Sequence, residues 1–115
     1  MERRLMNKYD SYKNFLEKKL VSKYGIHKIG DKEYMKFSNF GLLLHAFPDV
    51  QAFCIEYSDN MEQVKQWIFP EDGELFYVSD MTKSEILNSM IKEIEDNVDL
   101  SEDRIEQTMI DYKRL

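Results

Sequence analysis

The sequence predicts an α+β fold, with an N-terminal helix, an antiparallel sheet of about four strands, and two C-terminal helices that pack on or beside the sheet. Apolar residues recur at spacings of three and four before Gly25 and again after Thr82, which is typical of amphipathic helices. Between these segments, short aromatic and apolar runs alternate with turn residues, as in a sheet with tight connections. A chain of 115 residues fits one hydrophobic core, so we predict a single domain over residues 1–115.

The first helix is expected over residues 2–24. Its apolar stripe includes Leu5, Tyr9, Tyr12, Leu16 and Leu20. Gly25 is the expected end, because glycine readily takes the backbone conformation that terminates helices. Lysines fall largely off the stripe and near the negative end of the helix dipole, where they are favourable. They indicate a solvated face or a face that pairs with acidic segments.

The predicted sheet begins with a short hairpin, residues 26–29 and 33–37. Residues 42–47 form a compact apolar run that fits a strand or a short helix, and we favour a strand because a turn and another strand follow. That next strand, residues 52–57, shows clear alternation.

A second hairpin is expected from residues 64–69 and 74–80. Residues 70–73 read Pro-Glu-Asp-Gly, which suits a turn. A meander of three or four antiparallel strands over residues 42–79 is the simplest order.

Two helices are expected after the sheet. Thr82 and Glu85 have the spacing of a capping box, so a helix is expected to start near Lys83 and to run to about residue 98. Its apolar positions form one stripe, which we expect to cover the sheet. Ser101 is the expected N-cap of a last helix that runs to about Arg114.

Charge and composition restrict the classes of function. The net charge is −6, with ten Lys and Arg against five Asp and Glu in residues 1–36, and six against seventeen in residues 37–115. This acidity argues against direct binding of nucleic acid and favours a basic protein partner. No apolar run is long enough to span a bilayer, and the start lacks the apolar block of a signal peptide, so we expect a cytoplasmic protein with no membrane role.

The sequence contains no motif for catalysis, a cofactor or a metal, and we predict a protein that is not an enzyme. His27 and His45 lack metal-ligand spacing, and glycine-rich phosphate loops and serine nucleophile motifs are absent. The lone Cys54 lies in an apolar run and is interpreted as a buried small hydrophobe. An enzyme would be indicated instead by a closed pocket holding His45 beside a carboxylate with a perturbed pKa.

An acidic concentration near the C-terminus is the main candidate for a binding surface. Between residues 93 and 111 only Arg104 opposes eight carboxylates. Plain solubility explains such a surface, and so does a landing site for a cationic protein. On the second interpretation, aromatic side chains would serve as anchors, whereas Trp67 fits a place in the core equally well. The predicted partner-binding residues are Glu71, Asp72, Glu95, Asp96, Asp99, Glu102, Asp103, Glu106, Trp67 and Tyr77.

In these general features the chain resembles the small, acidic, single-domain immunity proteins with which bacteria neutralise contact-dependent or other secreted toxins. The shared features are a short α+β domain, an excess of acid, aromatic strands and no catalytic signature. Many proteins of this class plug a basic toxin site with carboxylates, and those around residues 96–103 and 71–72 would suit that role, but no single residue is carried over from the class. The chain also resembles acidic type III secretion chaperones, which dimerise and hold an effector segment. A monomer that binds one folded toxin would favour the first class and a partner-free dimer the second, and the sequence leaves the oligomeric state open.

Overall fold

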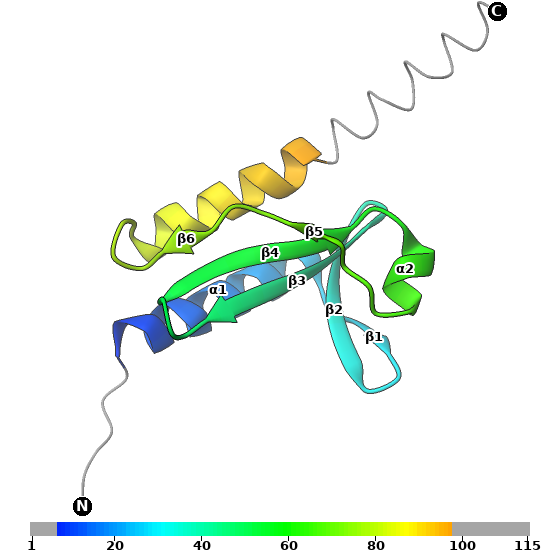
Figure 1. The fold of residues 1–115 in the computed structure, drawn as a ribbon, viewed down its shortest axis with the longest axis horizontal. Coiled ribbons are helices and arrows are strands. Elements are labelled where there is room, and N and C mark those ends of the chain that lie inside the picture. The colour runs from blue at the N-terminus through cyan, green and yellow to red at the C-terminus, as the bar shows by residue number, and fades with distance from the viewer. Residues whose placement is uncertain (1–6, 98–115) are drawn as a thin grey trace, which may run out of the picture.

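The computed structural model describes residues 7–97, which form a β-sheet with two long helices packed on one face (Figure 1). Helix α1, Lys8–Tyr24, confirms the predicted first helix within these residues. The Asn7 side chain accepts a hydrogen bond from the Asp10 amide at 2.8 Å and so satisfies an amide at the helix start. Gly25 ends the helix with φ of 77°, and its amide donates to the Val21 carbonyl at 2.8 Å.

The sheet is entirely antiparallel, and its order follows the chain. The predicted strands over residues 26–29, 33–37, 42–47 and 52–57 are confirmed in outline. The strands are β1 (His27–Ile29), β2 (Lys32–Phe37), β3 (Phe40–Phe47), β4 (Ala52–Ser58), β5 (Glu71–Asp72) and β6 (Phe76–Tyr77). β5 and β6 both pair with β4, so they follow one another along the same edge of the sheet.

The predicted hairpin of residues 64–69 and 74–80 is wrong. Residues of the first arm belong to a short helix, α2, Met61–Lys65, and to the link that follows it. Asn60 caps α2 by accepting from the Glu62 amide at 2.8 Å, and this local capping outweighs the strand propensity of the run. The expected turn at residues 70–73 is an edge strand instead, because β5 pairs with β4 and the Gly73 amide donates to the Ile55 carbonyl at 2.7 Å.

Strand β2 divides its pairing between two neighbours. Residues 32–34 pair with β1, while residues 35–37 pair with β3. The β1–β2 hairpin therefore projects away from the main sheet (Figure 1). As a consequence, β3 has a strand partner on its β2 side only over residues 40–42.

A helix over residues 83–97 covers the same face of the sheet as α1. The predicted capping box is confirmed, since the Thr82 amide donates to Glu85 at 3.0 Å and the Glu85 amide donates back to Thr82 Oγ1 at 3.2 Å. The predicted last helix, residues 101–114, lies outside the described residues.

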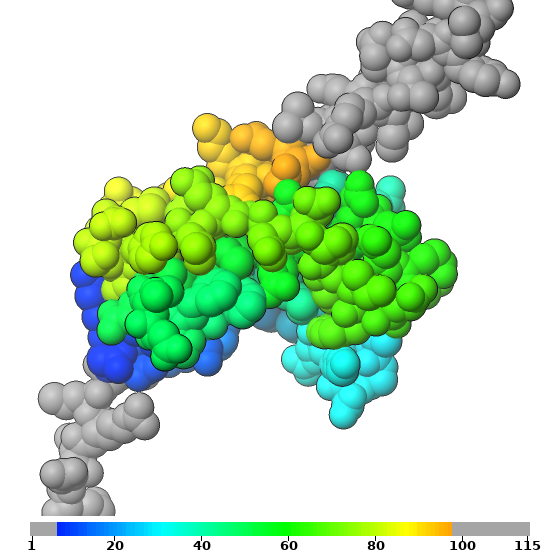
Figure 2. Space-filling model, in the orientation of Figure 1, coloured from blue at the N-terminus to red at the C-terminus, as the bar shows by residue number. Residues whose placement is uncertain are grey.

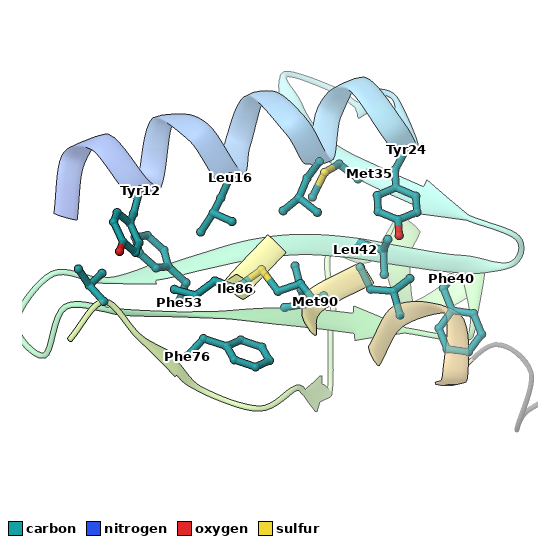
Figure 3. Packing of buried hydrophobic residues seen from close by; sticks show 14 of the residues in the cluster. Tyr12, Leu16, Tyr24, Met35, Phe40, Leu42, Phe53, Phe76, Ile86 and Met90 are labelled. Carbon is teal, nitrogen blue, oxygen red and sulfur yellow. The ribbon is translucent and has the colours of Figure 1, made fainter. Parts of the chain in front are cut away.

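The main core lies between the sheet and these two helices (Figure 3). Leu16 of α1, Phe53 of β4 and Met90 of the 83–97 helix are fully buried in it. Phe53 also stacks on Tyr9, with ring centroids 5.0 Å apart. The opposite, outer face of the sheet carries α2 at one end, where Val64 of α2 lies against Gly41 of β3.

Candidate functional site

An acidic groove runs between the edge of the sheet at β6 and the 83–97 helix. Its volume is about 590 Å³. The carboxylates that line it lie on the helix and in the segments that flank β6, with Lys92 as the cation among the lining residues that the structure describes. Leu75 and Tyr77, exposed at 41% and 38%, lie at the same groove. We define the acidic groove by Glu74, Asp80, Glu93 and Asp96 together with Leu75 and Tyr77.

Glu93 reaches from the helix to the edge of the sheet. Its two carboxylate oxygens accept from the Glu74 amide at 3.3 and 3.2 Å. The carboxylate also lies against Gly73, where a side chain would collide with it. Burial raises the pKa of Glu93, the Glu74 charge raises it further, and the hydrogen bond from the Glu74 amide opposes both. The fold thus holds a carboxylate where ionisation is disfavoured.

Glu71 and Asp72, both predicted as partner-binding residues, extend the negative surface along β5. Both are exposed, and they stand opposite Tyr57 and Glu56 of β4. Burial raises the pKa of Tyr57, and the charges of Glu71 and Glu93 raise it further. Carboxylates of β5 and of the 83–97 helix therefore both act on the Tyr57 hydroxyl. This indicates that β5 and the acidic groove belong to one negative region.

The remaining predicted carboxylates divide into two groups. Asp96 lines the acidic groove, whereas Glu95 faces α1 and pairs with Lys23 at 3.6 Å. Burial, with a smaller effect of Glu95, raises the pKa of Tyr24 to about 12. Glu95 is therefore already balanced by a lysine of the first helix. The other four, Asp99, Glu102, Asp103 and Glu106, lie outside the described residues.

The two predicted aromatic anchors lie in different places. Tyr77 is at the acidic groove, but Trp67 follows α2 and is half-buried. Its ring meets those of Phe69 and Tyr34 edge-on, with centroids 5.1 and 6.2 Å away. Lys32 Nζ lies 5.4 Å from the Trp67 ring centroid. Trp67 therefore contributes to packing beside a cation, and the structure does not bring it to the acidic groove.

A cluster of His45, Cys54 and Glu56 on the outer face was not foreseen from the sequence. His45 stands opposite Cys54 across β3 and β4, and His45 Nδ1 contacts Glu56 Oε1. The length of the connection at residues 48–51 fixes which residues of the two predicted strands stand opposite each other. It is the sequence feature from which the pairing of His45 with Cys54 could have been predicted.

This cluster lacks the reactive group that a cysteine nucleophile needs. Cys54 is 3% exposed, as predicted for a small buried hydrophobe. Burial, and then the charges of Asp72, Glu56 and Glu93, raise the pKa of its thiol to about 11. A thiol in such surroundings stays protonated and weakly nucleophilic at neutral pH. Within residues 7–97, no group of three or more His, Cys, Asp or Glu residues is arranged to hold a metal ion.

Comparisons of the chain with protein-family models, with curated proteins and with solved structures found no match. Among the described residues, no helix has the length and apolar character needed to cross a membrane. The chemistry of the acidic groove therefore has to be interpreted from its own geometry.

Proposed function

We propose that this chain is a non-enzymatic, cytoplasmic binding protein that neutralises a cognate basic bacterial toxin, as immunity proteins do. The acidic groove is the observation that supports this proposal most directly. Carboxylates of Glu74, Asp80, Glu93 and Asp96 surround it, and Leu75 and Tyr77 are exposed beside them. Charge of one sign steers an oppositely charged protein, and adjacent apolar and aromatic groups provide area that can be desolvated on binding.

The environment of Glu93 favours a cationic partner over plain solubility. A solubilising carboxylate works best fully in water, where ionisation carries no desolvation cost. Glu93 is instead partly buried, with a raised pKa, at a fixed position set by the Glu74 amide. A lysine or arginine that enters the groove would offset this cost and meet a preformed acceptor.

The test uses a toxin from the same cell, encoded by the gene beside the one for this chain. Co-expression is expected to restore growth of cells that produce the toxin, and the purified pair is expected to bind more weakly as salt rises. Glu74→Lys and Asp96→Lys each reverse a charge in the groove and should weaken binding by about tenfold or more, which is ~1.4 kcal/mol.

Asp31→Lys is the matched control. Asp31 is an exposed carboxylate in the turn between β1 and β2, outside the residues that line the groove. Its reversal changes the net charge equally but should leave binding within about twofold, as expected for a distant surface charge. Equal losses from all three variants, or binding that is insensitive to salt, would contradict docking at the acidic groove.

A further inference from the structure

The second half of β3 is an open sheet edge. Residues 43–47 pair with β4 on one side, but β2 has turned away and no strand of residues 7–97 pairs on the other side. No backbone hydrogen bond from a loop of the described chain reaches residues 43–47 either. Every second residue of such a strand directs its amide and carbonyl outward, where they can pair with another strand. We call residues 43–47 the open edge.

The sheet edges at β1 and at β5–β6 carry features that discourage strand addition. β1 has only three residues and includes Lys28. The β5–β6 edge is interrupted at Gly73, carries Glu71 and Asp72, and has its Glu74 amide occupied by Glu93. Short strands, edge charges and interruptions are the usual protection against unwanted pairing. The open edge, Leu-Leu-His-Ala-Phe, has none of them.

A hollow of about 380 Å³ lies beside the open edge. Figure 2 shows the indentation between the cyan β1–β2 hairpin and the green surface of β3. The hollow is lined by apolar side chains, including Val21 and Ile26, which are 37% and 41% exposed. Its charged lining residues are Glu17 and Glu33, and both are acidic. If β2 continued to pair along β3, it would fill this space. The space is therefore open, with an apolar lining and two negatively charged side chains.

We propose that a partner protein docks by adding an extended strand to the open edge, with apolar and basic residues in turn along the face of the strand that meets the hollow. Its main-chain groups pair with residues 43–47, and its apolar side chains enter the hollow beside Val21 and Ile26. Its lysine or arginine residues lie close to Glu17 and Glu33. This binding mode is β-strand addition, in which backbone hydrogen bonds supply affinity and side-chain pockets supply specificity. The inference rests on the proposed function, because it assigns the contact to the same basic partner.

Charge selects this occupant over a second copy of the chain. Glu17 and Glu33 give the hollow negative lining charge, although Lys28 lies 3.8 Å from Glu33. The chain as a whole carries −6, so two copies repel at long range. A cationic strand is attracted both by the negative lining of the hollow and by the net negative charge of the chain.

The binding test uses a synthetic peptide with the repeat Val-Thr-Lys-Thr, which places Val and Lys in turn on one face of the strand, and its N-methylated counterpart. N-methylation of alternate residues removes the amide donors that pair with the open edge and leaves the charge unchanged. The unmodified peptide is expected to shift the amide signals of residues 43–47 in NMR spectra and to bind at least about tenfold more tightly than the N-methylated one. Equal affinity for both peptides, shifts confined to the acidic groove, or no binding up to about 1 mM, the weak end of measurable affinity, would overturn the inference.

Two variants locate the contact on the protein. Leu43→Lys places a charge on the open edge, and Glu17→Lys reverses a lining charge at an exposed helix position, so the second should fold even if the first does not. Each should weaken the unmodified peptide by about tenfold, whereas reversal of Asp59, an exposed carboxylate after β4 that does not line the hollow, is the control that stays within about twofold. A chain that instead dimerises through residues 43–47 without any peptide would overturn the inference and favour the chaperone interpretation.

The same variants separate this inference from the proposed function. If toxin binding is lost on reversal of Glu74 or Asp96 but survives Leu43→Lys and Glu17→Lys, the function stands and strand addition is refuted. If no toxin is neutralised yet the peptide still binds through residues 43–47, the proposed function fails while the open edge remains a strand-binding site.

Discussion

Gly41 allows α2 to pack on the outer face of the sheet, and replacing it with alanine is expected to destabilise the protein. A Cβ atom at Gly41 would lie 2.6 Å from Val64 Cγ2 and 3.3 Å from Phe69 Cε1. Ordinary contact begins at 3.4 Å, so the Val64 methyl group would have to move by about 0.8 Å. Val64 is fully buried, which leaves it little room to move. Overpacking of this kind costs about 1–3 kcal/mol.

A double-mutant cycle measured by urea unfolding tests this explanation. Val64→Ala alone should cost about 1–3 kcal/mol, because it removes two buried methyl groups. The double variant Gly41→Ala with Val64→Ala should lose at least ~1 kcal/mol less stability than the sum of the two single losses. The reason is that the new methyl group at position 41 occupies the space vacated by Val64. Free energies of unfolding that add within about 0.5 kcal/mol would refute the proposed contact.

Three further predictions follow from single residues. Trp67 has φ of 60° after α2, so Trp67→Gly should unfold at higher urea than Trp67→Ala, with a difference of about 1 kcal/mol and the reverse of the usual order. Burial raises the pKa of Glu93 above 4.5, so the folded state holds the proton more tightly and its stability falls as pH rises from 4.5 through the folded pKa. Glu93→Gln should therefore be more stable than the parent at neutral pH, with the gain vanishing below pH 4.5 in urea titrations; a gain that persists in acid would contradict this assignment. Burial raises the pKa of Cys54 from 9.0 to about 11, which lowers the thiolate fraction at neutral pH by about 100-fold, so iodoacetamide should label the native protein much more slowly than the unfolded chain. Equal labelling rates would contradict its burial.

The helices could be predicted because their signals are local. Periodic apolar residues, Gly25 and the Thr82–Glu85 capping box each lie within a few residues of the contact that they make. The strand over residues 52–57 was predictable for the same reason, because its alternation is visible in sequence. The fold class follows from these elements alone.

The hairpin over residues 64–80 was mispredicted because its sequence supports two structures. Residues 64–69 are rich in β-formers, but Asn60 starts a helix and Trp67 ends it with a left-handed backbone. Residues 70–73 contain a turn-forming pair of Pro and Gly, yet the edge of β4 offers partners for Glu71 and Asp72. Local capping decided the structure of the first arm, and tertiary pairing decided that of residues 70–73.

The candidate site was only partly predictable, because burial and pairing are set by distant residues. Asp96 and Tyr77 could be chosen from charge and aromaticity, and the fold places both at the acidic groove. Glu95 follows the same sequence pattern as Asp96, but its contact with Lys23 depends on how two helices pack. The role of Glu93 depends on the position of the Glu74 amide, and no local pattern encodes that distance.

The open edge and the acidic groove lie on either side of strand β4 and are joined by one row of paired residues. Ala52 of β4 pairs with Phe47 of the open edge on one side and with Tyr77 of the acidic groove on the other. Ala52 is fully buried, while Tyr77 remains 38% exposed. Neighbouring strands lie about 4.8 Å apart, so this row spans roughly 10 Å between strand axes, which is less than the width of a standard protein interface. A single partner can therefore pair with the open edge and place a basic side chain in the acidic groove. On this geometry Tyr77, the aromatic side chain of the acidic groove, is expected to be the main aromatic anchor, whereas Trp67 packs against Tyr34 and Phe69.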